Sequence, residues 1–282
     1  MRPPALPLRA HPAPEPADQD FAPLLNEPFA NAWAGSTSPA SADATQRARL
    51  LARASASRAA SDAMCTTRLK RLPIGEVAAG VRERRLYAAP QARPLRPGEP
   101  LRARLIELAP GARWDGPGAE HHREWLVLRG SALVGDEALR LRDYHALPAG
   151  AAQGAVHTEA GALLFLRESA LAVRTGDKPF TVWDDVAGWP DFAPGIRRRV
   201  LWQREGQAAM LYLAQPGASV PLHTHGHDEE CLMVQGELFL DDVLLQEGDY
   251  QLAPAGTSHR ITETDTGVVI YAHGDLDLRF VA

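Results

Sequence analysis

The sequence predicts an all-β protein of two tandem antiparallel β-barrels, preceded by an N-terminal segment that is partly disordered and partly helical. Short runs rich in Val, Leu, Tyr and Trp alternate with Gly- and Pro-bearing turns over most of the chain, which is typical of antiparallel sandwiches and barrels. This pattern occurs twice at a nearly constant spacing. We therefore expect an N-terminal segment over residues 1–68, a first barrel over 69–175 and a second barrel over 176–282.

The N-terminal segment is expected to be disordered at its start and helical further along. Residues 1–19 hold six prolines and little apolar surface, so burial cannot offset the entropy of ordering them, and we expect disorder. The stretch Phe21–Trp33 predicts a short helix that docks on another surface. A further helix, rich in Ala and Arg, is expected to begin at a cap on Ser41 or Asp43 and to run to about Cys65.

This Ala- and Arg-rich helix and the residues after it are locally basic. Between Arg47 and Arg71 the basic residues face a single acid, Asp62. We expect a solvated helix that packs through Leu50, Leu51 and Ala54; the alternative is a helix that binds a protein partner.

Charge and cysteine content limit the partners and the compartment. The formal net charge of -5 and the pI near 6.1 argue against a protein that binds nucleic acid through a broad basic face. No run approaches the ~20 apolar residues that a membrane span needs, and the N-terminus lacks the apolar stretch of a secretory signal. Two cysteines, Cys65 and Cys231, cannot form a disulfide framework. We therefore expect a cytoplasmic protein with no membrane partner and no direct nucleic-acid partner.

The barrels are expected to contain strands at the runs richest in apolar and β-branched residues. These runs are Arg102–Leu108, Glu124–Leu128, Leu163–Arg167, Ala208–Leu213, Cys231–Val234 and Val268–Ala272. The first three fall in the first copy of the repeat and the last three in the second copy.

The repeat itself is visible residue by residue. Gly80–Tyr87 aligns with Gly195–Trp202, which lies 115 residues later. From Pro110 onward the spacing is 106 residues, and at this spacing the Pro-Gly-Ala of 110–112 matches 216–218, the Asp-Tyr of 143–144 matches 249–250, and the Pro-Ala-Gly of 148–150 matches 254–256. The shorter spacing means that the first copy carries nine extra residues, most simply in a loop around Pro90–Pro100.

The second copy contains a spaced set of histidine, glutamate, glycine and proline residues. They are Gly217, His223, His225, Glu229 and Gly236, followed by Gly248, Pro254, Gly256 and His259, and they satisfy the patterns G-x5-H-x-H-x3-E-x6-G and G-x5-P-x-G-x2-H. Residues i and i+2 of a strand share a face, so His223 and His225 are expected to point into the same interior. Glu229 enters from the start of the next strand, and His259 returns on a later hairpin. Three imidazoles and a carboxylate that converge in this way predict one divalent-metal site per chain.

Neighbouring residues have weaker expected roles. Glu230 should point away from the interior if Glu229 points into it, and Cys231 should point inward as lining or as an oxidant-reactive thiol near the metal. His227 is expected in a solvent-facing turn, with a fifth ligand as the alternative. Glu230 and His227 are also the two candidates for a catalytic acid or base.

The first copy keeps the glycines and prolines but loses the predicted ligands. At the 106-residue spacing, His223 corresponds to Pro117, His225 to Ala119, Glu229 to Arg123 and His259 to Gln153. We therefore expect a structural or docking barrel without metal. Two alternatives remain for this copy: a site rebuilt from His121, His122 and Glu124 with His145 or His157, or an anion bound by Arg123.

The two patterns together form the two-part cupin motif, and Pro221–Gly274 resembles the ChrR-type cupin family. The shared residues are the His-x-His-x3-Glu-Glu run at 223–230 and the Gly-Asp-Tyr-x3-Pro-x-Gly-x2-His run at 248–259. The resemblance implies an RmlC-like jelly-roll fold and a zinc-binding barrel such as those that transmit redox or singlet-oxygen signals in anti-sigma factors. It implies a sigma factor, or another protein, as a partner of the N-terminal segment. The zinc-binding His-x3-Cys-x2-Cys module of those proteins is absent from this sequence.

Two classes of function follow from these residues. The first is a regulatory or sensing protein in stress or redox signalling, with one divalent ion in the second barrel, most simply zinc. The alternative is a mononuclear dioxygenase in which the same residues hold Fe(II) and the barrel takes a small aromatic or diketone substrate. Mn and Ni also suit this donor set, and the native ion would separate the two classes.

Overall fold

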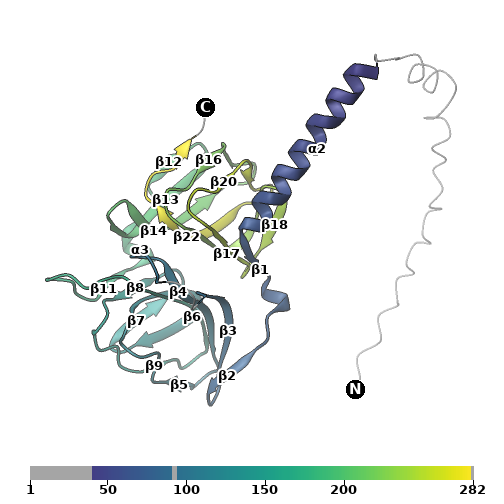
Figure 1. Cartoon of the computed structure of the whole chain (residues 1–282). Coiled ribbons are helices and arrows are strands. Elements are labelled where there is room, and N and C mark those ends of the chain that lie inside the picture. Colours follow the sequence, from purple (N-terminus) through teal and green to yellow (C-terminus); the bar gives the residue numbers. More distant parts are fainter. Residues whose placement is uncertain (1–39, 91–93, 281–282) are drawn as a thin grey trace, which may run out of the picture. The chain divides into compact units, whose positions relative to one another are not determined.

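The computed structural model describes residues 40–90 and 94–280 (Figure 1). The disorder expected for residues 1–19 and the helix expected at Phe21–Trp33 lie outside the described residues. Helix α2 spans Ala40–Ala63, close to the expected bounds. None of the described helices combines the length and the apolar character that a membrane crossing demands. Leu50 and Leu51, through which this helix was expected to pack, are 57% and 61% exposed.

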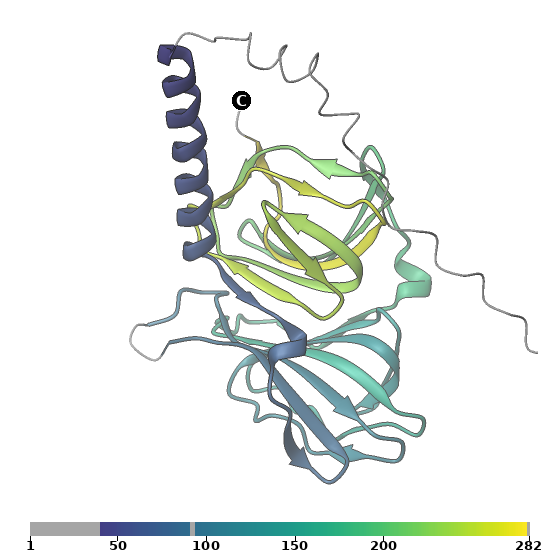
Figure 2. The ribbon, with the colours of Figure 1, turned by 90° about the vertical axis from the view of Figure 1, so that its right-hand side faces the viewer.

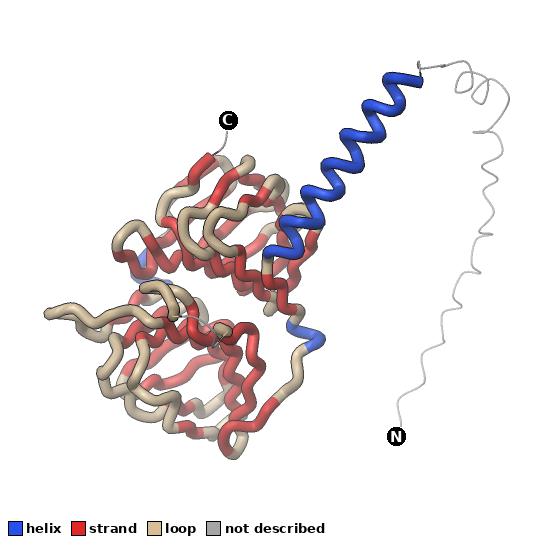
Figure 3. Tube along the Cα trace, in the orientation of Figure 1, coloured by secondary structure: helices blue, strands red, loops and turns tan. Residues whose placement is uncertain are grey.

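Residues 56–282 form one compact unit that contains both copies of the repeat, and strands dominate its regular secondary structure (Figure 3). The strands of the first barrel are β2 (Gly75–Ala78), β3 (Val81–Ala88), β4 (Pro100–Leu108), β5 (Arg113–Trp114), β6 (His122–Val134), β7 (Glu137–Arg140), β8 (Tyr144–Leu147), β9 (Val156–His157), β10 (Ala162–Ser169) and β11 (Phe180–Val182). Their main sheet has the order β11-β8-β6-β10-β4-β3-β2, and every pair in it is antiparallel.

The second copy repeats this arrangement. Its strands are β12 (Asp191–Ala193), β13 (Ile196–Arg204), β14 (Gln207–Ala214), β15 (Ser219–Val220), β16 (His223–Thr224), β17 (Glu229–Leu240), β18 (Val243–Gln246), β19 (Tyr250–Ala253), β20 (Ser258–His259), β21 (Thr262–Glu263), β22 (Val268–Asp275) and β23 (Arg279–Phe280). The main sheet has the order β1-β19-β17-β22-β14-β13-β12, where β1 is Cys65–Thr67. The six expected strands are therefore confirmed.

The loop expected in the first copy is also confirmed. Eleven residues, 89–99, connect β3 to β4, whereas only Glu205 and Gly206 connect the equivalent strands β13 and β14. Gly206 has φ +80° and Glu205 has φ +53°, as a tight two-residue hairpin turn of this kind requires. The nine extra residues lie in this connection.

The first strand of each copy pairs with the main sheet of the other copy. Strand β1 pairs with β19 of the second sheet, and β11 pairs with β8 of the first sheet. After each strand, a backbone N–H donates to an aspartate: Leu69 N to Asp249 Oδ1 at 2.9 Å and Asp184 N to Asp143 Oδ1 at 2.7 Å. Because these two exchanged segments are 115 residues apart, the repeat begins at about Cys65, inside the segment that the sequence analysis assigned to residues 1–68. The short helices η2 (Leu69–Arg71) and α3 (Asp184–Ala187) follow the two strands.

The apolar core has three parts. One cluster fills the interior of the first barrel and another fills that of the second. The third cluster joins the two copies, whose sheets lie next to each other in Figure 2. It includes Leu86, Leu105, Phe165, Leu211, Leu232 and Tyr271. The main-sheet strands are consequently buried on both faces, which explains why they read as continuous apolar runs rather than as an alternation of apolar and polar residues.

A buried charged network lies between the two copies. Arg167 on β10 donates through Nη1 to Glu124 Oε1 at 2.7 Å, through Nη2 to Gly98 O at 2.6 Å and through Nε to Glu230 Oε2 on β17. Tyr250 donates to Glu230 at 2.7 Å. All three charged side chains are at most 2% exposed, so this network is part of the interior of the molecule.

Candidate metal centre

The predicted ligands come from three elements at one end of the second barrel. His223 lies in β16 and stands opposite His259 of β20 in the antiparallel pair. His225 follows β16, and its backbone is fixed by bonds from His225 N to Thr257 O at 3.1 Å and from Gly256 N to His225 O at 2.7 Å. The centroids of the three imidazole rings are 5.0–5.7 Å apart.

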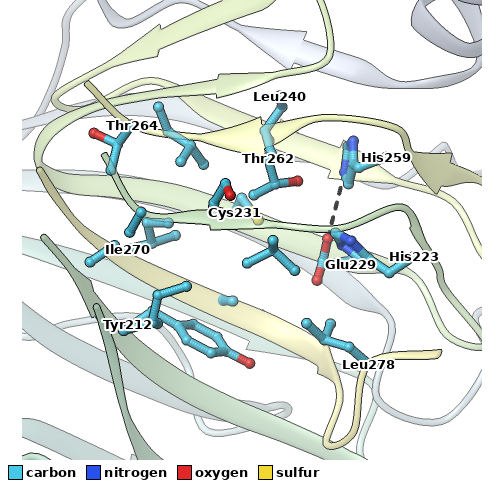
Figure 4. A pocket seen from close by; sticks show the side chains of 17 residues that line it. Tyr212, His223, Glu229, Cys231, Leu240, His259, Thr262, Thr264, Ile270 and Leu278 are labelled. Atoms are coloured by element: carbon cyan, nitrogen blue, oxygen red, sulfur yellow. Dashed lines mark ion pairs between the residues drawn. The ribbon is translucent and has the colours of Figure 1, made fainter. Parts of the chain in front are cut away.

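Glu229, the first residue of β17, completes the set. Its Oε2 lies 3.5 Å from His225 Nε2 and 3.6 Å from His259 Nε2, and the second of these contacts is drawn in Figure 4. Ligand atoms of His223, His225 and Glu229 all lie within 4.8 Å of one another. Two ligands that each lie about 2.1 Å from a tetrahedral ion are separated by about 3.4 Å, so the observed spacing suits a shared ion. The structure thus brings the four predicted residues together.

The hydrogen bonding of the imidazoles also suits a metal. His223 Nδ1 lies 2.9 Å from Pro221 O, which directs its other ring nitrogen toward the site. In the part of the chain that the structure describes, His225 Nε2 and His259 Nε2 are buried and have no hydrogen-bond partner. Buried polar atoms are normally satisfied, so these two nitrogens fit the role of metal ligands.

The protonation states point the same way. Burial lowers the pKa of His223, and burial together with the neighbouring His259 lowers the pKa of His225 to about 4. Both imidazoles are therefore neutral at pH 7, which is the form that binds a metal ion. Burial raises the pKa of Glu229, and a nearby cation would favour its charged form.

Three residues outside the predicted set hold these side chains in place. Asp241, in the turn after β17, places Oδ2 3.5 Å from His259 Nδ1 and accepts the backbone N–H of Arg260 at 2.7 Å. Asp275 accepts the backbone N–H of Gly226, between His225 and β17. Gly274 lies so close to Glu229 that a Cβ there would stand 3.3 Å from Glu229 Cα. None of these roles follows from the motif spacing.

A pocket opens beside the four residues and is mainly apolar (Figure 4). His223, Glu229 and His259 form its polar end, and the rest of its lining includes Tyr212, Leu238, Leu240, Ile270 and Leu278. Cys231 lines it, as the strand alternation predicts. Burial raises the pKa of the Cys231 thiol well above its ordinary value, so the thiol is protonated at pH 7 and lacks the reactivity of a thiolate.

The two candidates for a catalytic acid or base lie outside this pocket. Glu230 points away from the site, as expected, but it enters the buried network with Arg167 rather than solvent. His227 is 34% exposed, and its Nδ1 contacts Asp275 Oδ1. Neither side chain is among the residues that line the pocket.

In the first copy, the counterpart of Glu229 and two histidines of the alternative site make internal contacts. Arg123 is 1% exposed and donates to Ala151 O at 2.5 Å and to Gln153 Oε1 at 3.3 Å. His145 Nδ1 lies 2.9 Å from Thr181 Oγ1 of the exchanged strand β11. His122 is buried near the interface, with its ring 6.0 Å from that of Trp202.

The two barrels place the chain among proteins of the cupin fold. Similar solved structures include a candidate dioxygenase from Nostoc punctiforme (16% identity, TM-score 0.55, 78% of this chain and 81% of that chain), the Bacillus subtilis oxalate decarboxylase with Mn(II) centres (14%, 0.54, 74% and 76%) and the E. coli protein Ylba (15%, 0.60, 75% and 90%). At these identities the likeness concerns the fold.

The family assignment comes from the second copy. Residues 177–277, which contain all four predicted ligands, match the family model of the ChrR cupin-like domain. The match covers the second barrel and leaves the rest of the chain unmatched. No curated protein sequence matches the chain.

Proposed function

We propose that this protein is a regulatory or sensing bicupin that binds one divalent ion through His223, His225, Glu229 and His259. The observation that carries the proposal is the convergence of three buried imidazoles on one carboxylate, with two imidazole nitrogens that lack a hydrogen-bond partner among the described residues. The match to the ChrR cupin-like domain supports a role in stress or redox signalling. Zinc is the proposed ion for this role, because imidazole nitrogens and a carboxylate oxygen are among its usual ligands.

Strand β17 supports a signalling role because it links the candidate site to the other barrel. Glu229 faces the site, and the next residue, Glu230, faces the opposite side and bonds to Arg167 of the first copy. A displacement of Glu229 when the ion is lost would therefore act on a strand that is anchored in the interface. We propose that this is how the site communicates with the rest of the protein.

The proposed partner is a sigma factor or another protein that binds through the N-terminal segment. Helix α2 supports this assignment, because Arg47, Arg49, Leu50 and Leu51 are exposed on it. Apolar and basic side chains exposed together on a helix suit a partner groove with an acidic rim.

The second candidate is a metal-dependent dioxygenase, and the apolar pocket beside the site favours it. In this case the ion would be Fe(II), which would supply the binding of dioxygen, and the pocket would hold a small organic substrate. His223, Glu229 and His259 would orient the reacting end of the substrate, while Leu240 and Ile270 would exclude water.

The first test is the metal content of the protein purified without chelators. We expect about one divalent ion per chain, and its loss together with a lower melting temperature in the double variant His223→Ala/His225→Ala. The matched control is His121→Ala in the first copy, which should keep the ion. Unchanged metal content in the double variant would place the ion elsewhere and overturn the proposal.

The identity of the ion and the behaviour of the whole chain separate the two candidates. Tetrahedral zinc and tight co-purification of a protein partner that is lost on truncation of residues 1–63 support the regulatory role. An iron-loaded protein that consumes oxygen with a small aromatic compound or diketone supports the dioxygenase instead.

A further inference from the structure

The pocket of the second barrel differs from its counterpart in the first barrel by a few small residues. Cys231 and Ala272 line the pocket, and the equivalent residues of the first copy are Trp125 and Leu166. Both of these larger side chains are fully buried in the apolar interior of the first barrel. Trp114, which takes the place of Val220, packs edge-on against Trp125 with ring centroids 6.2 Å apart.

This comparison shows that the fold does not need the pocket. The first barrel reaches a filled interior with the same strands, and unfilled apolar space lowers stability. The small side chains at 231 and 272 thus leave a space that the second barrel would otherwise fill. A ligand that occupies the space explains why it is kept.

The charges around the pocket restrict that ligand. Of the seventeen described residues that line it, none is Arg or Lys, and Glu229 is the one carboxylate. A divalent ion bound by three neutral imidazoles and Glu229 would leave one net positive charge. A ligand with one negative charge balances it, whereas a dianion would bury an uncompensated charge, which is costly in an apolar site.

One polar group of the pocket lining, the hydroxyl of Thr262, lacks a hydrogen-bond partner among the described residues. Thr262 Oγ1 is buried, and Thr262 stands opposite Leu240 in the pairing of β21 with β17 (Figure 4). The hydroxyl of Thr264, by contrast, is satisfied by a bond to Glu237 O at 2.7 Å. A buried hydroxyl without a partner is suited to a hydrogen bond with an oxygen of a ligand.

We infer that the pocket binds a small, otherwise apolar molecule that carries one negative charge on an oxygen-bearing end, such as the enolate of a ketone, and that turns this end toward Thr262 and the ligands His223, Glu229 and His259. The inference rests on the proposed metal site. It excludes dicarboxylates such as oxalate, although oxalate decarboxylase shares the fold.

The test uses two chelators of similar size that differ in charge and polarity. Titration calorimetry on the zinc-loaded full chain compares 2,4-pentanedione, which binds metals as a monoanion, with oxalate, a dianion. We expect 2,4-pentanedione to bind at least about tenfold more tightly than oxalate. Tighter or equal binding of oxalate would overturn the inference while the metal site stands, whereas a wild-type protein that binds no ion would overturn both.

Two variants that introduce residues of the first barrel locate the bound probe. Ala272→Leu fills the pocket as Leu166 does, and Thr262→Val removes the hydroxyl as Val156 does; each should weaken 2,4-pentanedione binding about tenfold or more at unchanged zinc content. Ala187→Leu, an exposed position on α3, adds the same volume outside the pocket and should bind like the wild type. Unchanged binding in Thr262→Val, which preserves shape and folding, would show that the probe binds elsewhere and would overturn the inference.

Discussion

Replacement of Arg167 by methionine should destabilise the protein far more than the loss of an ordinary ion pair. The side chain is 1% exposed and holds two carboxylates, Glu124 and Glu230, that are equally buried. Removal of one partner from a buried ion pair costs roughly 3–5 kcal/mol, because the other charge is left uncompensated. Here two charges are left, so we expect a loss at the upper end of that range, which is a large part of the ~5–15 kcal/mol that stabilises a typical domain.

Guanidinium unfolding, followed by tryptophan fluorescence and circular dichroism, measures this loss as a change in midpoint at constant slope. Arg102→Met is the matched control, since Arg102 pairs with Glu168 at 2.8 Å but is 41% exposed; its pair should contribute only ~0–1 kcal/mol. The triple variant Arg167→Met/Glu124→Gln/Glu230→Gln removes all three charges and should recover much of the stability. The reasoning is refuted if Arg167→Met loses no more than Arg102→Met, or if the triple variant is no more stable than Arg167→Met.

Three further predictions concern single side chains. Burial alone would raise the pKa of Glu124, but the charge of Arg167 outweighs it and the pKa falls from 4.5 to about 2. The ionised Glu124 carboxylate therefore stabilises the folded protein fully above pH 4.5, and this stabilisation is lost as the pH falls toward 2. In unfolding curves, the stability advantage of the wild type over Glu124→Gln should shrink over this pH range. Asp241→Asn should weaken zinc binding about 10–100-fold in competition with a chelator, while the variant of its exposed neighbour, Asp242→Asn, should not. Cys65 is exposed and Cys231 is buried with a raised pKa, so an aromatic disulfide reagent should label one thiol in the native protein and two in urea; fast labelling of both would contradict the described burial.

Local patterns in the sequence were enough to predict the strands and the convergence of the four candidate ligands. His223 and His225 share a face because they are two residues apart in an extended segment, and the turn chemistry of Pro254 and Gly256 brings His259 back to it. The nine-residue insertion could be located because spacing between repeats is a property of the chain itself. Each of these inferences depends on residues that are close in sequence or matched by the repeat.

The features that the sequence did not reveal depend on contacts between the copies. The exchange of β1 and β11 involves two three-residue strands that carry no distinctive periodicity, although the 115-residue spacing extends to both of them. The sequence does not distinguish Arg167 from the other arginines in strands, because its role depends on the two main sheets facing each other. Likewise, Asp241 in the turn after β17 and Asp275 at the end of β22 are specified by no part of the cupin motif, and only their contacts at the candidate site give them a role.

The network around Arg167 also explains what the fusion of two copies makes possible. At the 106-residue spacing, Glu124 matches Glu230 and Tyr144 matches Tyr250, but Arg167 matches His273. In a dimer of identical chains every interface residue occurs twice, so a central arginine would meet its own copy across the symmetry axis. A single chain can place one guanidinium between two carboxylates and put a neutral imidazole at the equivalent position of the second copy. Burial, the positive charge of Arg167 and other nearby charges lower the pKa of this imidazole, His273, to about 3. Its ring stacks on Trp202 with centroids 5.5 Å apart. The same freedom from symmetry allows one barrel to be filled with tryptophans while the other keeps a pocket beside its histidines.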